Sequence, residues 1–141
     1  MRSQTTLIRD SFELVAETPH AIVQLFYGRL FELDPSLRGM FKTDIKVQAT
    51  KLVDTLKAVV DLVEQPEALL PTLHELGRQH MIYGVQPAHY DSVRMALLWA
   101  LGQALQGDFD KETRAAWDGV LIWISREMIG AGQSTNGDNK S

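Results

Sequence analysis

The sequence predicts an all-α protein of about seven or eight helices, and three observations carry this prediction. Apolar residues recur at intervals of three, four or one in nearly every segment, which places them on one face of a helix. No segment alternates apolar and polar residues as a half-buried strand does. Prolines and glycines fall between the periodic segments, where helices start and stop.

Two helices are predicted in the first third of the chain. The first covers residues 7–17 and ends before Pro19, because the residue that precedes a proline is pushed out of the α region. The second follows Pro19. Their inward faces carry, in order, Leu7, Ile8, Phe12 and Val15, then Val23, Phe26, Tyr27, Leu30 and Phe31.

A short helical turn and a long helix come next. Asp34 followed by Pro35 is typical of an N-cap with proline at the first helical position, and it starts the turn over residues 35–41. Asp44 is predicted to cap the long helix. The apolar face of that helix extends from Ile45 to Val63.

Prolines and one glycine divide the central part of the chain. Pro66 opens a helical stretch, which Pro71 is predicted to divide into two pieces because proline breaks helix interiors. Gly84 suits the C-terminal cap of the second piece. Pro87 then starts a helix that bears Tyr90 and a row of leucines.

The last helix is predicted to begin at Asp108 or Asp110 as its N-cap and to turn Trp117 inward. Beyond Gly130 the residues are small and polar, so they bury too little surface to offset the entropy of ordering. We therefore expect one folded domain over residues 1–130 and a disordered polar tail over 131–141.

Composition narrows the classes of function. Apolar residues make up 45% and charged residues 23% of the 141, an ordinary balance for a globular domain. The net charge is −4 without a basic cluster, which disfavours nucleic acid as a partner. There is no cysteine, so disulfides and thiolate chemistry are excluded. The N-terminus lacks the apolar segment of a signal peptide, and we expect a cytoplasmic protein without a membrane span.

Three polar residues fall on apolar helix faces: Tyr27, Gln48 and His80. Buried polar groups need partners, so these three either bond to other groups in the core or line a common pocket. Gly77 lies on nearly the same face as His80, and a glycine there leaves room for a flat group to approach the backbone. The chain has no HExxH motif for zinc. A Ser-His-Asp triad stays open on spacing, although no GxSxG motif is present.

Three segments, in this order and spacing, resemble the globin family: "FYGRLFELDPSLRGMF", "LGRQHMIYGV" followed by "HY", and "TRAAW". The resemblance covers roughly residues 5–130, and it is closest to bacterial single-domain globins related to flavohaemoglobins and to neuroglobins. It implies a globin fold around a haem pocket, with haem b (iron protoporphyrin IX) as the cofactor and O2, NO or CO as ligands.

The resemblance also assigns roles to residues of this chain. It implies that His80 binds the iron through Nε2 and that its Nδ1–H donates to a backbone carbonyl near Leu76. Tyr27 and Gln48 would donate hydrogen bonds to the ligand on the opposite face. The remaining implied haem contacts are Phe41, which stacks on the ring, Leu52 over the iron, and Val85 after the proximal helix.

Two further contacts carry less weight. Lys51 is expected to pair with a haem propionate, with an exposed lysine as the alternative, and His74 to approach the haem edge.

The chain also departs from the family pattern. Gln48 replaces the distal histidine of many animal globins. Flavohaemoglobins carry a proximal Tyr–Glu pair, of which Tyr90 matches the tyrosine while Gly132 falls near the place of the glutamate.

We expect a protein that binds O2 tightly and reversibly at ferrous iron, suited to storage, sensing or detoxification rather than to transport. The alternative is nitric oxide dioxygenation with an external reductase, because no flavin or nicotinamide domain follows. A third possible class of function is that of a sensor module that has a globin fold but binds no haem.

Overall fold

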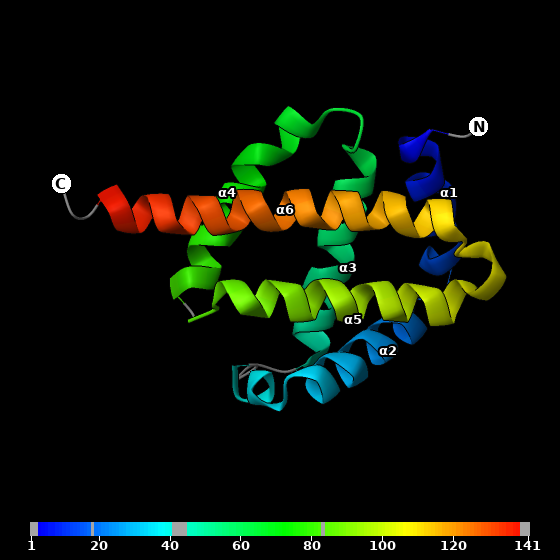
Figure 1. Ribbon diagram of the computed structural model, residues 1–141, viewed down its shortest axis with the longest axis horizontal. Helices are drawn as coiled ribbons and strands as arrows, with labels where there is room; N and C mark the ends of the chain where they lie inside the picture. Colours follow the sequence, from blue (N-terminus) through cyan, green and yellow to red (C-terminus); the bar gives the residue numbers. More distant parts are fainter. Residues whose placement is uncertain (1–2, 18, 41–44, 83, 139–141) are drawn as a thin grey trace.

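The computed structural model describes the backbone of residues 3–17, 19–40, 45–82 and 84–138, and their side chains except at 19, 40, 45–49 and 133–138. The all-α prediction is confirmed (Figure 1). Over the described residues, six α-helices and two short 3-10 helices follow one another. They are α1 (Gln4–Ala16), α2 (Pro19–Leu33), η1 (Pro35–Met40), α3 (Ile45–Asp61), α4 (Pro66–Ile82), α5 (Pro87–Leu105), η2 (Gln106–Asp108) and α6 (Lys111–Asp138).

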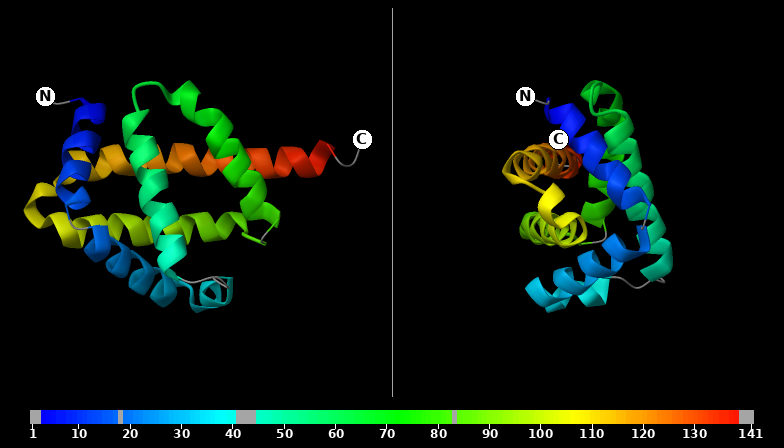
Figure 2. Two further views of the ribbon diagram at one scale, coloured as in Figure 1. Left: turned by 180° about the vertical axis from the view of Figure 1, so that it is seen from behind. Right: turned by 90° about the vertical axis from the view of Figure 1, so that its right-hand side faces the viewer.

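The helices form two crossed layers. The long helices α5 and α6 run side by side, and α1, α3 and α4 cross them on one side (Figures 1 and 2). Helix α2 lies along the edge of this arrangement and packs against α5. The most extensive helix contacts join α4 to α6 and α2 to α5. No helix of the described chain has the length and apolar character that crossing a bilayer requires.

The apolar core of the described residues falls into two clusters. The larger one joins α1, α2, α3, α5 and α6, and its least exposed members are Ile8, Leu30, Ala96, Ala100 and Trp117. The smaller one consists of Leu69, Leu73 and Met128, where α4 meets α6. The helix that carries His80 therefore rests on a small cluster of its own, at one side of the main core.

Trp117 is the centre of the larger cluster. It is fully buried, and its indole Nε1 donates to Ser11 Oγ at 2.8 Å. Ser11 Oγ in turn lies 2.7 Å from the Leu7 carbonyl oxygen, to which it donates. The one polar atom of the indole is thus satisfied across α1 and α6, so burial of the tryptophan leaves no polar atom unpaired.

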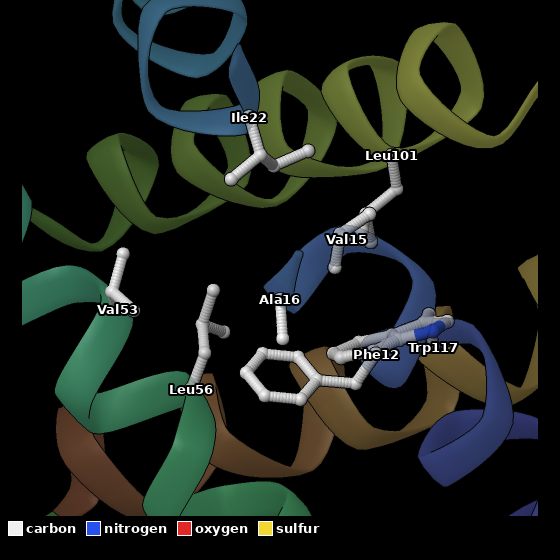
Figure 3. A pocket seen from close by; sticks show the side chains of 8 residues that line it. All are labelled: Phe12, Val15, Ala16, Ile22, Val53, Leu56, Leu101 and Trp117. Carbon is white, nitrogen blue, oxygen red and sulfur yellow. The ribbon is translucent and has the colours of Figure 1, made fainter. Parts of the chain in front are cut away.

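A small apolar cavity lies beside this tryptophan (Figure 3). Its volume of about 20 Å³ is room for roughly one water molecule, yet it offers no polar surface to hold one. The lining side chains come from five helices: Phe12, Val15, Ala16, Ile22, Val53, Leu56, Leu101 and Trp117. None of the predicted haem contacts whose side chains the structure describes lines it, so we regard it as a packing gap of the larger cluster.

The helix starts follow the predicted caps where the structure describes them. Asp110 Oδ1 accepts from the Thr113 N–H at 2.8 Å, so Asp110 rather than Asp108 caps α6. Asp34 Oδ1 accepts from the Ser36 N–H at 3.2 Å at the start of η1. Asp44 lies outside the described residues.

The predicted break at Pro71 is wrong, because α4 continues through it from Pro66 to Ile82. A proline removes one backbone hydrogen bond of the helix and crowds the preceding turn. Leu69 and Leu73, on either side of it, are 3% and 1% exposed. Burial of these two leucines against α6 outweighs the lost bond, so packing overrides the local preference.

The C-terminal helix extends further than composition predicts. Helix α6 continues to Asp138, into the segment 131–141 for which we expected a polar tail. Gly132 is buried because it packs against α4 near Gly77 and Met81. Gly132, which composition assigns to the tail, is therefore part of a helix crossing that composition does not reveal.

Candidate functional site

His80 lies in the last turn of α4, and its ring is oriented by the preceding turn. Nδ1 donates to the Leu76 carbonyl oxygen at 2.7 Å, which is the predicted bond. Burial lowers the pKa of His80, because it disfavours the charged imidazolium, while the bond to the Leu76 carbonyl opposes this shift. The ring is therefore neutral at pH 7 with its hydrogen on Nδ1, so Nε2 carries a lone pair that can bind a metal.

The C-terminal end of α4 is held by a Schellman cap. The Val85 N–H donates to the His80 carbonyl and the Gly84 N–H to the Met81 carbonyl, both at 3.0 Å. Gly84 has a φ of +90°, a conformation that glycine adopts without strain. The predicted role of Gly84 is thus confirmed. The cap fixes the backbone of His80 on its C-terminal side and leads directly to the half-buried Val85.

Tyr90 of α5 is the aromatic neighbour of His80. The centroids of the two rings lie 6.2 Å apart, with 32° between their planes. Burial raises the pKa of Tyr90, so its hydroxyl is protonated at pH 7. At Gly132, near the place of a glutamate in the flavohaemoglobin pattern, an added Cβ would lie 3.2 Å from the Gly77 carbonyl oxygen. Position 132 therefore lies in a tight helix crossing without a carboxylate.

The prediction that Gly77 leaves room for a flat group is wrong. A Cβ built on it would lie 2.1 Å from the carbonyl oxygen of Met128, so the space beside it is filled by the backbone of α6. The apolar face of α4 predicted that His80 is at least partly buried, which agrees with the structure. It could not reveal that a neighbouring helix already occupies the space at Gly77.

His74 pairs with a carboxylate of α6. Its Nε2 lies 3.0 Å from Glu127 Oε1, and this pair joins α4 to α6. The two histidines of α4 thus have different surroundings: His74 faces a carboxylate of α6, whereas His80 bonds only to its own backbone through Nδ1. A carboxylate partner gives His74 a structural function in the contact between the helices.

Tyr27 is buried in α2, with 7% of its surface exposed, as its place in an apolar stripe predicted. Its ring packs edge-on against Phe26, with centroids 5.0 Å apart, and stacks on Phe31 at 6.0 Å. Burial raises the pKa of Tyr27 to about 12. The phenol therefore keeps its hydrogen at any physiological pH and can act as a hydrogen-bond donor.

This raised pKa predicts an alkaline loss of stability that Tyr27→Phe should remove. Unfolded tyrosine has a pKa of 10.0 against about 12 in the folded chain, so the unfolded state loses the proton first as pH rises. Between pH 9 and 11, wild type should lose about 1.4 kcal/mol more unfolding free energy than the variant. Urea unfolding of the haem-free proteins at both pH values measures this difference, and parallel losses would contradict it.

The residues predicted on α3 are described in part. Leu52 is half-buried and packs against the larger core cluster, and Lys51 is exposed. Gln48 belongs to α3, but its side chain lies outside the described residues, as does Phe41. The structure thus brings His80 together with Leu76 and Tyr90, and it places Tyr27 and Leu52 in the neighbouring core cluster. The described part of the chain holds no group of three His, Cys, Asp or Glu side chains placed to bind a metal ion.

Known proteins resemble this chain in sequence. A flavohemoprotein of Xylella fastidiosa is 29% identical over 127 residues, which cover 88% of this chain and 32% of the relative. Neuroglobin of Danio rerio is 30% identical over 151 residues, covering 96% of this chain and 93% of the relative. The chain thus spans about a third of the length of the flavohemoprotein and nearly the whole of neuroglobin.

Solved structures share the fold. An engineered carbene transferase from Rhodothermus marinus, whose parent is named as a nitric oxide dioxygenase, aligns with a TM-score of 0.87. It has 24% sequence identity, and the alignment covers 100% of this chain and 99% of that one. A bacterial globin from Campylobacter jejuni aligns with a TM-score of 0.82 at 20% identity, over 95% of this chain and 97% of its own.

The family model for globins matches residues 24–128, which include Tyr27, Leu52, His80 and Tyr90. The match extends from α2 to the middle of α6, and it contains every described residue that we had assigned to the site. By this match and by the neuroglobin relative, the chain belongs to the globin family, whose members bind small gas molecules at haem.

Proposed function

We propose that this protein binds O2, and other diatomic gases such as NO or CO, reversibly at the ferrous iron of haem b. His80 is the proximal ligand in this proposal, and Tyr27 and Gln48 hold the gas molecule. The observation that carries it is the 2.7 Å bond from His80 Nδ1 to the Leu76 carbonyl. This bond leaves Nε2 as the ligating atom of a neutral ring, the form that a haem iron requires.

The surroundings of His80 suit a flat, largely apolar cofactor. When bound, haem would supply the iron together with the porphyrin nitrogens that hold it, so one imidazole from the chain, that of His80, would suffice as the protein ligand. Leu76 and Val85, next to His80 along the chain, are apolar but only half-buried, and they offer aliphatic surface that a porphyrin ring could cover. Leu52 is also half-buried, on α3 against the larger core cluster. In the same proposal Phe41 stacks on the ring and Lys51, which is exposed, pairs with a propionate.

Tyr27 contributes a hydrogen-bond donor that stays protonated, because its pKa is raised to about 12. A hydrogen bond to a charged or strongly polarised acceptor contributes about 1.5–3 kcal/mol. Since 1.4 kcal/mol corresponds to a factor of ten, losing this donor should speed O2 release by about ten- to a hundredfold. O2 that is released this slowly suits storage, sensing or detoxification better than transport.

Tyr27→Phe tests this assignment in the haem-loaded protein. O2 dissociation, followed by stopped-flow displacement with CO, should be about ten- to a hundredfold faster than in wild type. CO dissociation is the internal control: bound CO polarises less than O2, so its rate should change much less. An unchanged O2 rate would remove Tyr27 from the ligand site and leave Gln48 as the proposed donor.

The second candidate function is nitric oxide dioxygenation. Nitric oxide and O2 combine to nitrate, and an external reductase supplies one electron in each turnover. Two relatives support it: the flavohemoprotein, of which this chain spans 32%, and a structural neighbour whose parent is named as a nitric oxide dioxygenase. Slow O2 release favours this reaction as well, because O2 stays bound until nitric oxide arrives.

Repeated turnover distinguishes the binder from the catalyst. Haem-loaded protein is mixed with O2 and nitric oxide in the presence of a flavin reductase and its nicotinamide substrate. Stoichiometric nitrate, one per haem, would identify a gas-binding protein that reacts once. Many nitrates per haem, at a rate set by the reductase concentration, would establish the dioxygenase.

A further inference from the structure

Helix α4 touches α6 backbone to backbone at Gly77. A Cβ built on Gly77 would lie 2.1 Å from the Met128 carbonyl oxygen and 2.7 Å from the Met128 Cα, whereas real Cβ atoms keep about 3.0 Å or more. The atoms in the way belong to the backbone, so no rotamer change relieves the clash. Only glycine allows the two helices to lie this close.

Gly132, on α6 one turn after Met128, lies in the same contact between α4 and α6. A Cβ on Gly132 would lie 3.2 Å from the Gly77 carbonyl oxygen and 3.2 Å from Met81 Cβ and Sδ. This approach is tight but lies partly against a flexible side chain. Gly130, also on α6, has nothing within 4 Å of its built Cβ. The crossing is thus confined to one face of α6.

The crossing is linked to His80 by a single peptide unit. The carbonyl that accepts from His80 Nδ1 is that of Leu76, and it is bonded directly to the nitrogen of Gly77. Any displacement of Gly77 away from α6 therefore moves the acceptor that orients the imidazole. On its C-terminal side, His80 is held by the helix cap, in which the Val85 N–H donates to the His80 carbonyl.

We propose that Gly77 is a positioning residue for the proximal histidine: its contact with Met128 sets the position of His80 relative to α6. This inference rests on the proposed function of His80 as the haem ligand. An alanine at position 77 must move α4 outward by about 0.9 Å or more, the difference between 2.1 and 3.0 Å. The acceptor for Nδ1 moves with it, so the imidazole would present Nε2 to a bound iron from a changed position.

The experiment compares Gly77→Ala, Gly132→Ala and the matched control Gly130→Ala in the ferrous, haem-loaded protein. Resonance Raman spectroscopy reads the iron–histidine stretching frequency, and transfer of haem to an acceptor protein gives the rate of haem loss. We expect Gly77→Ala to shift the stretching band and to lose haem about tenfold faster or more. Gly132→Ala should shift the band in the same direction by less, and Gly130→Ala should match wild type.

A purely structural contact would lower the stability of Gly77→Ala without moving the band, and this result would overturn the proposal. A shift in Gly130→Ala equal to that in Gly77→Ala would also overturn it. Should Gly77→Ala fail to fold, the milder Gly132→Ala decides, and an unshifted band there rejects the positioning role.

Failure of the proposed function has a separate signature. Wild-type protein without any iron–histidine band would show that His80 is not the haem ligand. The proposal about Gly77 would then fail with it. The helix crossing itself would still be visible, because urea unfolding of the haem-free protein would show a larger loss of stability for Gly77→Ala than for Gly130→Ala.

Discussion

A His80→Gly variant is expected to lose tight haem binding, by more than about a hundredfold in affinity. Loss of a residue that merely orients a metal ligand typically costs 10- to 100-fold, so removal of the ligand itself should exceed that range. The measurement is haem titration followed by the Soret band, together with the rate of haem transfer to an acceptor protein. Added imidazole should restore the spectrum of the wild-type ferrous protein, since it fits the space that the side chain leaves.

His74→Gly is the matched control, because it removes another histidine from the same helix. His74 pairs with Glu127 on α6, so this variant should lose some stability while keeping the wild-type spectrum. The assignment of the proximal ligand would be rejected by equal haem affinity in His80→Gly and wild type. A failure of imidazole to restore the spectrum, in a variant that still folds, would indicate that the pocket itself had changed.

Trp117→Ala is expected to lower the free energy of unfolding by about 3–5 kcal/mol, the largest cost at any core position. The side chain is fully buried, and its indole nitrogen joins α6 to α1 through Ser11 at 2.8 Å. Truncation leaves a cavity beside the apolar gap already present and leaves the Ser11 hydroxyl without its donor. Thermal unfolding should show a decrease in Tm of roughly 10–20 °C.

Ser11→Ala separates the hydrogen bond from the packing. It keeps the indole in place and removes its acceptor, together with the hydroxyl's own bond to the Leu7 carbonyl, which should cost about 1–3 kcal/mol. Trp99→Ala serves as the control for loss of a tryptophan, because Trp99 is half-buried and should cost less than Trp117. Equal losses at the two tryptophans would contradict the central place of Trp117 in the core.

Helix identity was predictable from the sequence because it depends on local spacing. Apolar faces and capping residues determine each helix, which is why Asp110, Gly84 and the inward direction of Tyr27 agree with the structure. The bond from His80 to Leu76 was predictable for the same reason, since it lies within one helical turn.

Features that depend on a second helix were not predictable. Pro71 stays within α4 because its leucine neighbours pack on α6, and Gly132 is buried in α6 because α4 lies beside it. The role of Gly77 depends on where the backbone of Met128 lies, and no pattern in the sequence around Gly77 contains that information.

The division of the core has a consequence for local stability. Helix α4 carries the residue proposed to hold the iron, yet its buried contacts are those of a three-residue cluster, while the larger cluster stabilises the rest. Amide hydrogens of α4 should therefore exchange with solvent through partial opening, well before the amides around Trp117 do so. A cofactor bonded to this helix would add contacts beside the smaller cluster, so haem binding should slow the exchange of the α4 amides.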